Sequence, residues 1–169
     1  MYHIGREDVQ RPREWNRDPD MELPMAEHGF AALLRTHDGG GTHTLLFDTG
    51  PRPGVVVENA RRLGLELGAV EVVMISHGHW DHYGGLLSAL EAIGKRSVPV
   101  LIHHNMFHAL GHRDESGRVY ESRAAGLPAA DAIRAAGGEP TDSVEPALIA
   151  GDTVLVTGEI PRRTVYETG

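Results

Sequence analysis

The stretch SHGHWDHYGG, residues 76–85, constrains the fold most, because it places three histidines and one aspartate at a change of backbone pattern. The preceding run VEVVMIS, residues 70–76, is almost unbroken in apolar character, which is typical of a strand buried on both faces. The following segment, residues 83–95, has apolar side chains at helical spacing. The histidine cluster is therefore predicted to lie at the turn between a buried strand and a helix, with the paired glycines allowing that helix to approach closely.

Residue types and spacing in this cluster are those of a metal site. Alternate residues of an extended segment point the same way, so His77 and His79 can converge on one ion. Asp81 and His82, past the bend, can face a second ion. Imidazole and carboxylate ligands suit zinc, iron or manganese, and the chain has no cysteine to supply a thiolate or a disulfide. The alternative is a histidine-rich surface loop, which the position between a strand and a helix disfavours.

The rest of the chain alternates strands and helices, which predicts a layered α/β architecture. Glycines between two apolar runs, 29–36 and 42–50, predict a β-hairpin. Further strands are expected at 98–104 and in a closing hairpin over 146–161, and helices at 54–67, ending at Gly64, and at 128–138. Residues 111–127 are expected to be irregular.

Length and composition favour one soluble domain. The 169 residues are enough to bury a core; residues 1–25, with three prolines among charges, are predicted to form an extended arm ahead of a domain over 26–169. A net charge of -8 argues against a nucleic-acid-binding surface. With no long apolar segment for a membrane span and no apolar core for a signal peptide, the expected location is cytoplasmic.

The sequence SHGHWDHYGGL resembles the HxHxDH motif of the metallo-β-lactamase superfamily. The similarity extends upstream through FDTG and through the segments AEHGFAALL and NARRLGLEL. Downstream, TGEIPRRTVYE is similar to a segment of the branch that contains the dihydropterin–ribofuranosylaminobenzene phosphate synthases. The resemblance covers about residues 26–167.

This resemblance implies an αββα sandwich of the α/β (α+β) class, with two zinc ions at the edge between its sheets. It implies that His77 and His79 bind the first ion and that Asp81 and His82 bind the second. Iron or manganese are alternatives to zinc. A metal-activated water would attack an ester, amide or phosphoester, and Asp81 would also take up a proton during turnover. Asp48 would support the ligand loop from behind, the alternative being an ordinary turn aspartate before Gly50.

The motif supplies two ligands for each ion, whereas a catalytic zinc usually has three protein ligands. The resemblance implies a further histidine, a bridging aspartate and a last histidine from later segments, yet no histidine follows His112. The chain is therefore expected to resemble the N-terminal part of the fold, incomplete at its C-terminus. Four alternatives stay open: a fragment, a split enzyme completed by a partner chain, a homodimer that supplies its own ligands, or completion by nearby histidines.

For completion within the chain, His103 and His104 are the best candidates, because they end a strand predicted beside the motif strand. A surface role is the alternative for each. The resemblance makes His28 a pocket candidate, and Glu159 and Arg162 are weaker candidates for a substrate pocket.

The leading hypothesis is a metal-dependent hydrolase acting on a small molecule, with no nucleic-acid or membrane partner. The alternative is a non-catalytic, split or truncated homologue that needs a partner chain to complete its metal site. A half-sandwich leaves one apolar sheet face uncovered, so a homo-oligomer or a complementing second chain is expected.

Overall fold

The computed structural model describes residues 22–108, 111–121, 126–164 and 166, so most of the predicted arm lies outside the described residues. At its centre is a five-stranded sheet in the order β1-β2-β3-β4-β7. The predicted hairpin is confirmed as the antiparallel pair β1–β2, and the remaining neighbours are parallel. The five strands are β1 Ala32–His37, β2 Thr42–Phe47, β3 Val72–Met74, β4 Val98–Ile102 and β7 Gly138–Asp142.

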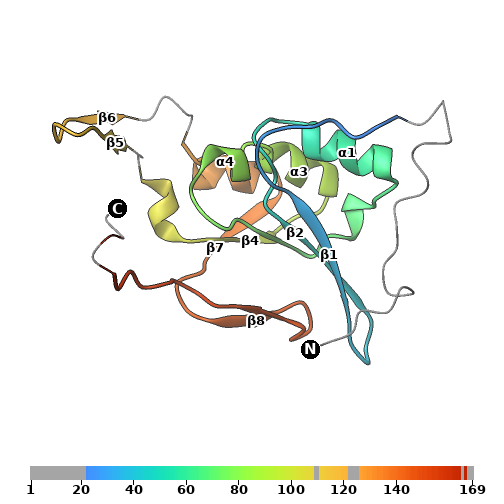
Figure 1. Ribbon diagram of the computed structural model, residues 1–169. Helices are drawn as coiled ribbons and strands as arrows, with labels where there is room; N and C mark the ends of the chain where they lie inside the picture. The colour runs from blue at the N-terminus through green and yellow to red at the C-terminus, as the bar shows by residue number, and fades with distance from the viewer. Residues whose placement is uncertain (1–21, 109–110, 122–125, 165, 167–169) are drawn as a thin grey trace, which may run out of the picture.

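Three helices cover one face of this sheet (Figure 1). They are α1 Val55–Leu63, α3 Leu86–Ile93 and α4 Ala130–Ala135; single turns form η1 Leu67–Ala69, α2 Trp80–Tyr83 and η2 His104–Phe107. Helix α1 ends where the sequence predicts, because Gly64 adopts the left-handed conformation at φ 65° and its N–H bonds the last turn. Helix α3 ends in the same way at Gly94.

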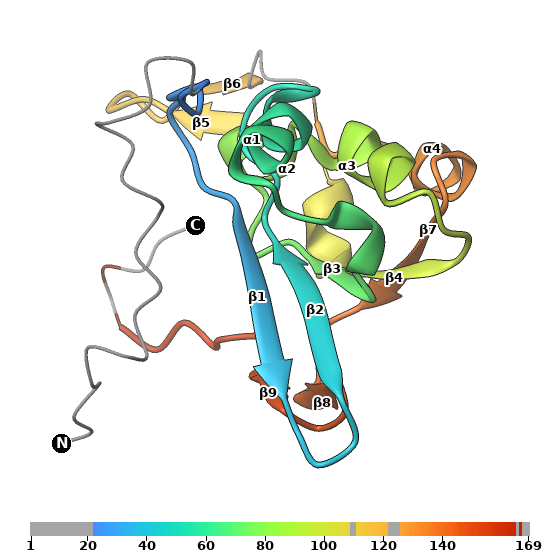
Figure 2. The same ribbon diagram turned by 90° about the vertical axis from the view of Figure 1, so that its right-hand side faces the viewer.

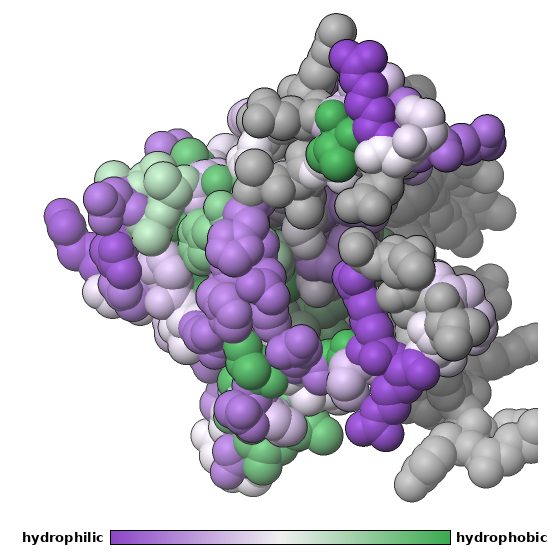
Figure 3. All heavy atoms as spheres, turned by 90° about the vertical axis from the view of Figure 1, so that its left-hand side faces the viewer, coloured by the Kyte–Doolittle hydropathy of each residue, from purple (hydrophilic) through white to green (hydrophobic). Residues whose placement is uncertain are grey.

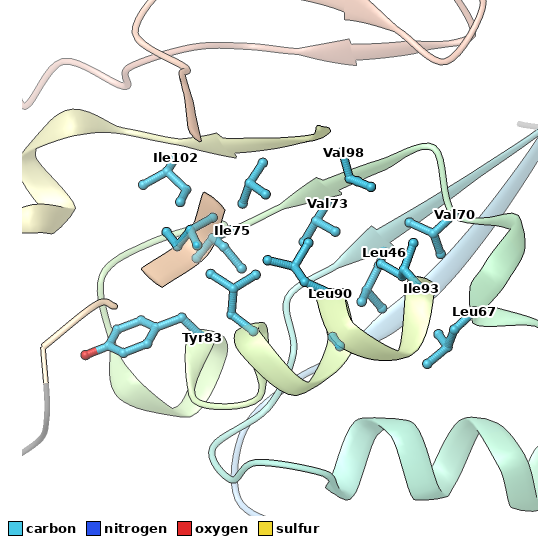
Figure 4. Close-up of a cluster of buried hydrophobic side chains, with 14 of the residues drawn as sticks. Leu46, Leu67, Val70, Val73, Ile75, Tyr83, Leu90, Ile93, Val98 and Ile102 are labelled. Atoms are coloured by element: carbon cyan, nitrogen blue, oxygen red, sulfur yellow. The ribbon is translucent and has the colours of Figure 1, made fainter. Parts of the chain in front are cut away.

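The main core lies between the sheet and these helices (Figure 4). Leu86, Leu90 and Ile93 of α3 are fully buried against Val73 and Val100, which lie on the two central parallel strands. Each such side chain contributes about 1.5–3 kcal/mol through removal of apolar surface from water. The apolar runs of β3 and β4 are therefore what holds the strand ends, and the residues that follow them, in fixed positions.

A second hairpin covers part of the opposite face (Figures 1 and 2). It consists of β8 Ala147–Ile149 and β9 Val154–Val156, as the sequence predicts, and Val156 packs on Leu45, Val72 and Leu101 of the sheet. On its outer side the cross-strand partners Leu148 and Leu155 are 57% and 61% exposed. The second face of the sheet is therefore covered in part, and the hairpin that covers it carries an apolar outer surface of its own.

Two features differ from the sequence-based expectation. Within 111–127, expected to be irregular, the strands β5 Gly111–Arg113 and β6 Val119–Glu121 pair as a hairpin beyond the end of β4 (Figure 1). Its turn is built by Asp114, whose carboxylate accepts N–H bonds from Ser116 and Arg118. Strand β7 was not predicted from the sequence; its Pro140 is tolerated because β7 lies at the edge of the sheet.

No helix among the described residues has the length and apolar character needed to cross a membrane.

Gly84 is predicted to be essential for the packing of the motif. A Cβ at this position would overlap the carbonyl oxygen of Pro51, a backbone atom that cannot move aside. We expect Gly84→Ala to lower the free energy of unfolding by about 1–3 kcal/mol or more, as overpacking usually does. Gly68→Ala is the matched control, because a Cβ there meets nothing within 4 Å. Urea unfolding of the two variants measures the difference, and equal stabilities would contradict the packing.

His43 makes the stability depend on pH. Its Nδ1 lies 2.9 Å from Glu71 Oε2 and its Nε2 lies 3.4 Å from Asp38 Oδ2, which joins the start of β3 to the β1–β2 turn. The hydrogen bond to Glu71, followed by that to Asp38, raises the pKa of His43 above 6.5. Because the folded-state pKa is the higher one, this stabilisation is fully present below pH 6.5 and is lost as the pH rises through the folded pKa.

We therefore expect His43→Gln to lower the thermal midpoint more at pH 5.5 than at pH 8.5. His37→Gln serves as the control, because His37 lies on the same hairpin and its Nδ1 lies 2.9 Å from the uncharged Thr42 hydroxyl. If His43→Gln lowers the thermal midpoint equally at both pH values, the proposed titration of His43 is excluded.

Candidate metal centre

Polar residues gather where the parallel strands end. Asp48 follows β2, the motif follows β3, His103 follows β4, and Asp142 is the last residue of β7. The carboxyl ends of neighbouring parallel strands lie at one edge of a sheet, which is where such folds bind ligands. Figure 3 faces the end of the molecule at which β4 runs out, and this face is hollowed, with polar side chains around the hollow. The strand ends thus assemble the candidate site from distant parts of the chain.

The motif backbone is tied to the loop after β2. His79 is extended, with φ -88° and ψ 138°, and immediately precedes the single turn α2, which carries Asp81 and His82. The N–H of His82 bonds the carbonyl of His79 at 3.0 Å, and the carbonyl of His82 accepts a bond from Thr49 N at 2.7 Å. The bend that the sequence predicts is therefore held from both sides.

The structure brings the four predicted ligands together. The His77 ring centroid lies 4.6 Å from that of His79 and 4.1 Å from that of His82. Asp81 Oδ2 lies 3.7 Å from His82 Nε2. Three imidazoles and one carboxylate thus form one continuous cluster.

Asp48 supports this cluster through its two carboxylate oxygens, which are contacted by three donors. Its side chain is 1% exposed; Oδ1 accepts a bond from Ser76 N at 2.8 Å, and Oδ2 accepts one from Ser76 Oγ at 2.7 Å. Oδ2 also lies 2.7 Å from His82 Nδ1. The Ser76 hydroxyl in turn lies 3.0 Å from His77 Nδ1. The second role considered for Asp48, that of an ordinary turn residue, does not account for these contacts, although Asp48 also turns the chain at φ 57°.

These contacts assign the ring protons. A carboxylate only accepts, so the Nδ1 of His82 carries a proton and donates it to Asp48. The hydroxyl of Ser76 donates its hydrogen bond to Asp48, so its oxygen accepts one from the Nδ1 of His77. When each ring is neutral, its Nε2 lone pair is then free. Carboxylate-backed imidazoles of this kind are typical of metal ligands, because the partner fixes the tautomer and the ring orientation.

The pKa of His77 also favours ligation. Burial lowers it first, and the neighbouring His82 and His79 lower it further, because two positive charges side by side repel each other. Only the neutral imidazole binds a metal, so the lowered pKa keeps His77 in the competent form at neutral pH.

Of the other candidates, only His28 has a contact with a motif residue among the described contacts. His28 is 84% exposed and its Nε2 lies 3.3 Å from Asp81 Oδ2, at the rim. Rings of His103 and His104 stack with centroids 4.6 Å apart; His103 Nε2 lies 3.5 Å from Glu159 Oε2, and His104 Nδ1 lies 2.9 Å from Asp142 Oδ2. Arg162 is exposed.

The imidazole and carboxylate groups of the motif are of the types that bind divalent metals, but their arrangement matches a metal site only in part. Two imidazoles have oriented, free Nε2 atoms, and Asp81 adds a carboxylate beside them. Within residues 22–108, 111–121, 126–164 and 166, however, no three His, Asp or Glu side chains are arranged as a group that could hold an ion. The motif residues would therefore have to converge, or gain a further ligand, on binding.

Two members of the network were not predicted as site residues. Ser76 was part of the quoted motif, but its link between Asp48 and His77 is visible only once β2 and β3 are side by side. Asp142 lies 38 residues from its partner His104, on the strand that was not expected. The sequence feature that could have indicated Asp142 is its place as a carboxylate at the end of a short segment that follows a predicted helix.

The chain is similar to proteins of a known family. The family model described as the metallo-beta-lactamase superfamily matches residues 26–167. The 7,8-dihydropterin-6-methyl-4-(beta-D-ribofuranosyl)-aminobenzene-5'-phosphate synthase of Methanocaldococcus jannaschii is 29% identical over 82 residues, 48% of this chain and 28% of that protein. Uncharacterized protein MJ0448 of the same organism is 30% identical over 152 residues, 85% of this chain and 50% of that protein.

A solved structure, that of Tm1679, described as a metal-dependent hydrolase of the beta-lactamase superfamily, is 27% identical with a TM-score of 0.45. The match covers 73% of this chain and 38% of that one.

The match to each curated relative spans half of that relative's length or less. Because the family model matches most of the chain, including the hairpin β1–β2, the motif and the segment after β9, the expected relationship is confirmed. The chain belongs to the metallo-β-lactamase superfamily and has a mixed α/β fold.

Proposed function

We propose that the protein is a metal-dependent hydrolase in which water attacks an ester, amide or phosphoester of a small molecule. The observation that carries this proposal is the Asp48 network, which leaves the Nε2 atoms of His77 and His82 free beside Asp81. A histidine-rich surface loop has no need of a buried carboxylate that orients two rings. Superfamily membership supports the same function.

In this proposal His77 and His79 hold one zinc ion and Asp81 and His82 hold a second. When bound, such ions lower the pKa of a coordinated water to about 7 and polarise the group under attack. The residues of the chain supply orientation: Asp48 holds His82 directly and His77 through Ser76. Asp81 Oδ2, between His28 at 3.3 Å and His82 at 3.7 Å, is placed to accept a proton and pass it to the exposed His28.

Two observations support a substrate class: the name of one relative, and an exposed aromatic side chain beside the motif ligands. One relative is named for a dihydropterin and a ribofuranosyl-aminobenzene phosphate, which supports an aromatic or phosphorylated substrate. Trp80, inside the motif, is 46% exposed and offers an aromatic face next to the ligands. The absence of cysteine fits the expected cytoplasmic location, which stays a prediction.

A second candidate is a chain that completes its site by association. It is favoured by the lack of a three-donor group among the described residues and by the outward pair Leu148 and Leu155. In this candidate a second copy or a partner chain supplies the remaining ligands. This alternative keeps the same motif residues as ligands and differs only in where the remaining ones come from.

Metal content tests the proposal. We expect purified chain, reconstituted with zinc and dialysed, to retain one to two ions per chain by elemental analysis. Both His77→Ala and His82→Ala should lose most of this zinc, whereas His37→Ala, at the far hairpin tip, should keep it. Hydrolysis of p-nitrophenyl esters and phosphoesters should follow the metal content.

Sedimentation of the same samples separates the two candidates. Zinc retained by the monomer supports completion within the chain, and zinc retained only by a dimer supports association. Retention of zinc by His77→Ala and His82→Ala alike would overturn both.

Asp48→Asn tests the orienting network. Asparagine keeps the shape and tolerates the left-handed backbone, but its amide cannot accept from Ser76 and from His82 as two carboxylate oxygens do. We expect zinc affinity to fall about 10–100-fold, the usual cost of losing such a partner. Asp152→Asn is the matched control, because Asp152 is also left-handed, at φ 61°, and lies in the β8–β9 turn. Calorimetric zinc titration of both variants gives the answer; equal affinities would remove Asp48 from the site.

A further inference from the structure

His103 and His104 follow β4 side by side, yet their rings are held in opposite ways. Their planes stack at 25°, with centroids 4.6 Å apart. His104 Nδ1 lies 2.9 Å from the carboxylate of Asp142, so this nitrogen carries the proton and Nε2 has a free lone pair. The two rings are therefore not interchangeable as metal ligands.

For His103 the tautomer is reversed. Its Nδ1 accepts a hydrogen bond from the backbone N–H of Asn105 at 3.2 Å, at the start of η2. The accepting nitrogen has no proton, so the proton of the neutral ring is on Nε2. A protonated nitrogen has no lone pair for a metal, and His103 is thereby distinguished from His77 and His82, whose Nε2 atoms are free.

The Nε2–H of His103 lacks an acceptor. Nε2 is buried and makes no hydrogen bond in the structure, which is costly for a polar atom removed from water. The carboxylate of Glu159 lies over it at 3.5 Å, too far for a proper bond. An unpartnered donor of this kind, at a candidate site, indicates a place for a ligand acceptor.

Glu159 is placed to share that ligand. Its backbone N–H bonds Val144 O at 2.8 Å, and Gly158, at φ 77°, brings the chain close enough for that contact. A Cβ on Gly158 would overlap the same carbonyl. The Glu159 side chain is 55% exposed, so it can rotate away from Nε2 while its backbone stays fixed. The segment after β9 thus presents a movable acceptor beside a fixed donor.

We propose that His103 and Glu159 form a substrate-binding pair that takes the N–H and C=O edge of a neutral amide or lactam. His103 Nε2–H donates to the substrate oxygen, and the Glu159 carboxylate accepts from the adjacent N–H. His103 is then a specificity residue and not a metal ligand. This inference rests on the proposed function, because it names the substrate group that this edge of the sheet recognises.

The charges around the pair favour a neutral group. Glu159 and, beside His104, Asp142 place two carboxylates close to His103, and the chain carries a net charge of -8. A phosphate or carboxylate facing His103 would meet Glu159 at short range and be repelled. An amide edge offers an acceptor to His103 and a donor to Glu159, so both partners are satisfied at once.

Nuclear magnetic resonance of the full chain labelled with 15N in histidine tests the proposal. Long-range 1H–15N spectra show which ring nitrogen carries the proton, and His103→Gln identifies the signals. We expect His103 to keep its proton on Nε2 both without metal and after addition of zinc. Conversion of His103 to a zinc-bound Nε2 would overturn the assignment.

The ligand class is tested on the metal-free chain with two probes at equal concentration, 2-pyrrolidinone and inorganic phosphate. We expect 2-pyrrolidinone to shift the His103 Nε2–H signal and phosphate to leave it in place. In Glu159→Ala the lactam should bind about 3- to 10-fold more weakly, as loss of one hydrogen bond predicts. Glu91→Ala, an exposed glutamate of α3, is the matched control and should bind as the parent chain does.

A shift with phosphate alone, no shift with either probe, or full lactam affinity in Glu159→Ala would each overturn the proposal. Its failure is distinguishable from failure of the proposed function. Zinc binding is read from the signals of His77 and His82, whereas lactam binding is read from His103 in the absence of metal.

Discussion

The site depends on one buried carboxylate. Asp48 lies where β2 ends, is 1% exposed, and accepts from the backbone and side chain of Ser76 and from His82. Its own N–H bonds Met74 O, so the same residue joins the ends of β2 and β3. Burying a carboxylate is unfavourable unless each oxygen is satisfied, and here three donors satisfy both. The same hydrogen bonds therefore stabilise the buried carboxylate and orient the two imidazoles.

That arrangement depends in turn on the parallel sheet. Strands β3 and β4 are short, but their side chains are buried between the helices and the hairpin β8–β9, so their ends cannot drift. Residues that follow parallel strands emerge at one edge, which brings Asp48, His77, His103 and Asp142 to the same side of the molecule. Gly84 and Gly85 let the turn after the motif lie directly on the loop 49–52. Core packing thus converts residues distant in sequence into neighbours.

The sequence predicts those parts of the fold that short-range patterns determine. The buried runs of β3 and β4, the glycine that ends α1 and the hairpins β1–β2 and β8–β9 are all visible as local patterns. Strand β7 is not, because GEPTD becomes a strand only by pairing with β4, and the hairpin β5–β6 depends on a turn built by the Asp114 carboxylate. The motif identifies the four clustered side chains. It does not reveal the role of Ser76 or of Asp142, because each acts through a partner on another strand.

The same physical device occurs twice along the sheet edge. Asp48 fixes the proton of His82 at Nδ1, and Asp142 does so for His104, which leaves Nε2 free in both rings. His103, whose ring stacks on that of His104, has its proton on the opposite nitrogen because a backbone N–H occupies Nδ1. Histidines that look equivalent in sequence therefore have different chemistry: Nε2 is a free acceptor in His82 and His104 and a donor in His103. A substrate held across β3 and β4 would meet metal-competent nitrogens beside the motif and a hydrogen-bond donor one strand further on. The partner of each ring, and not the number of histidines, decides which of them can bind a metal.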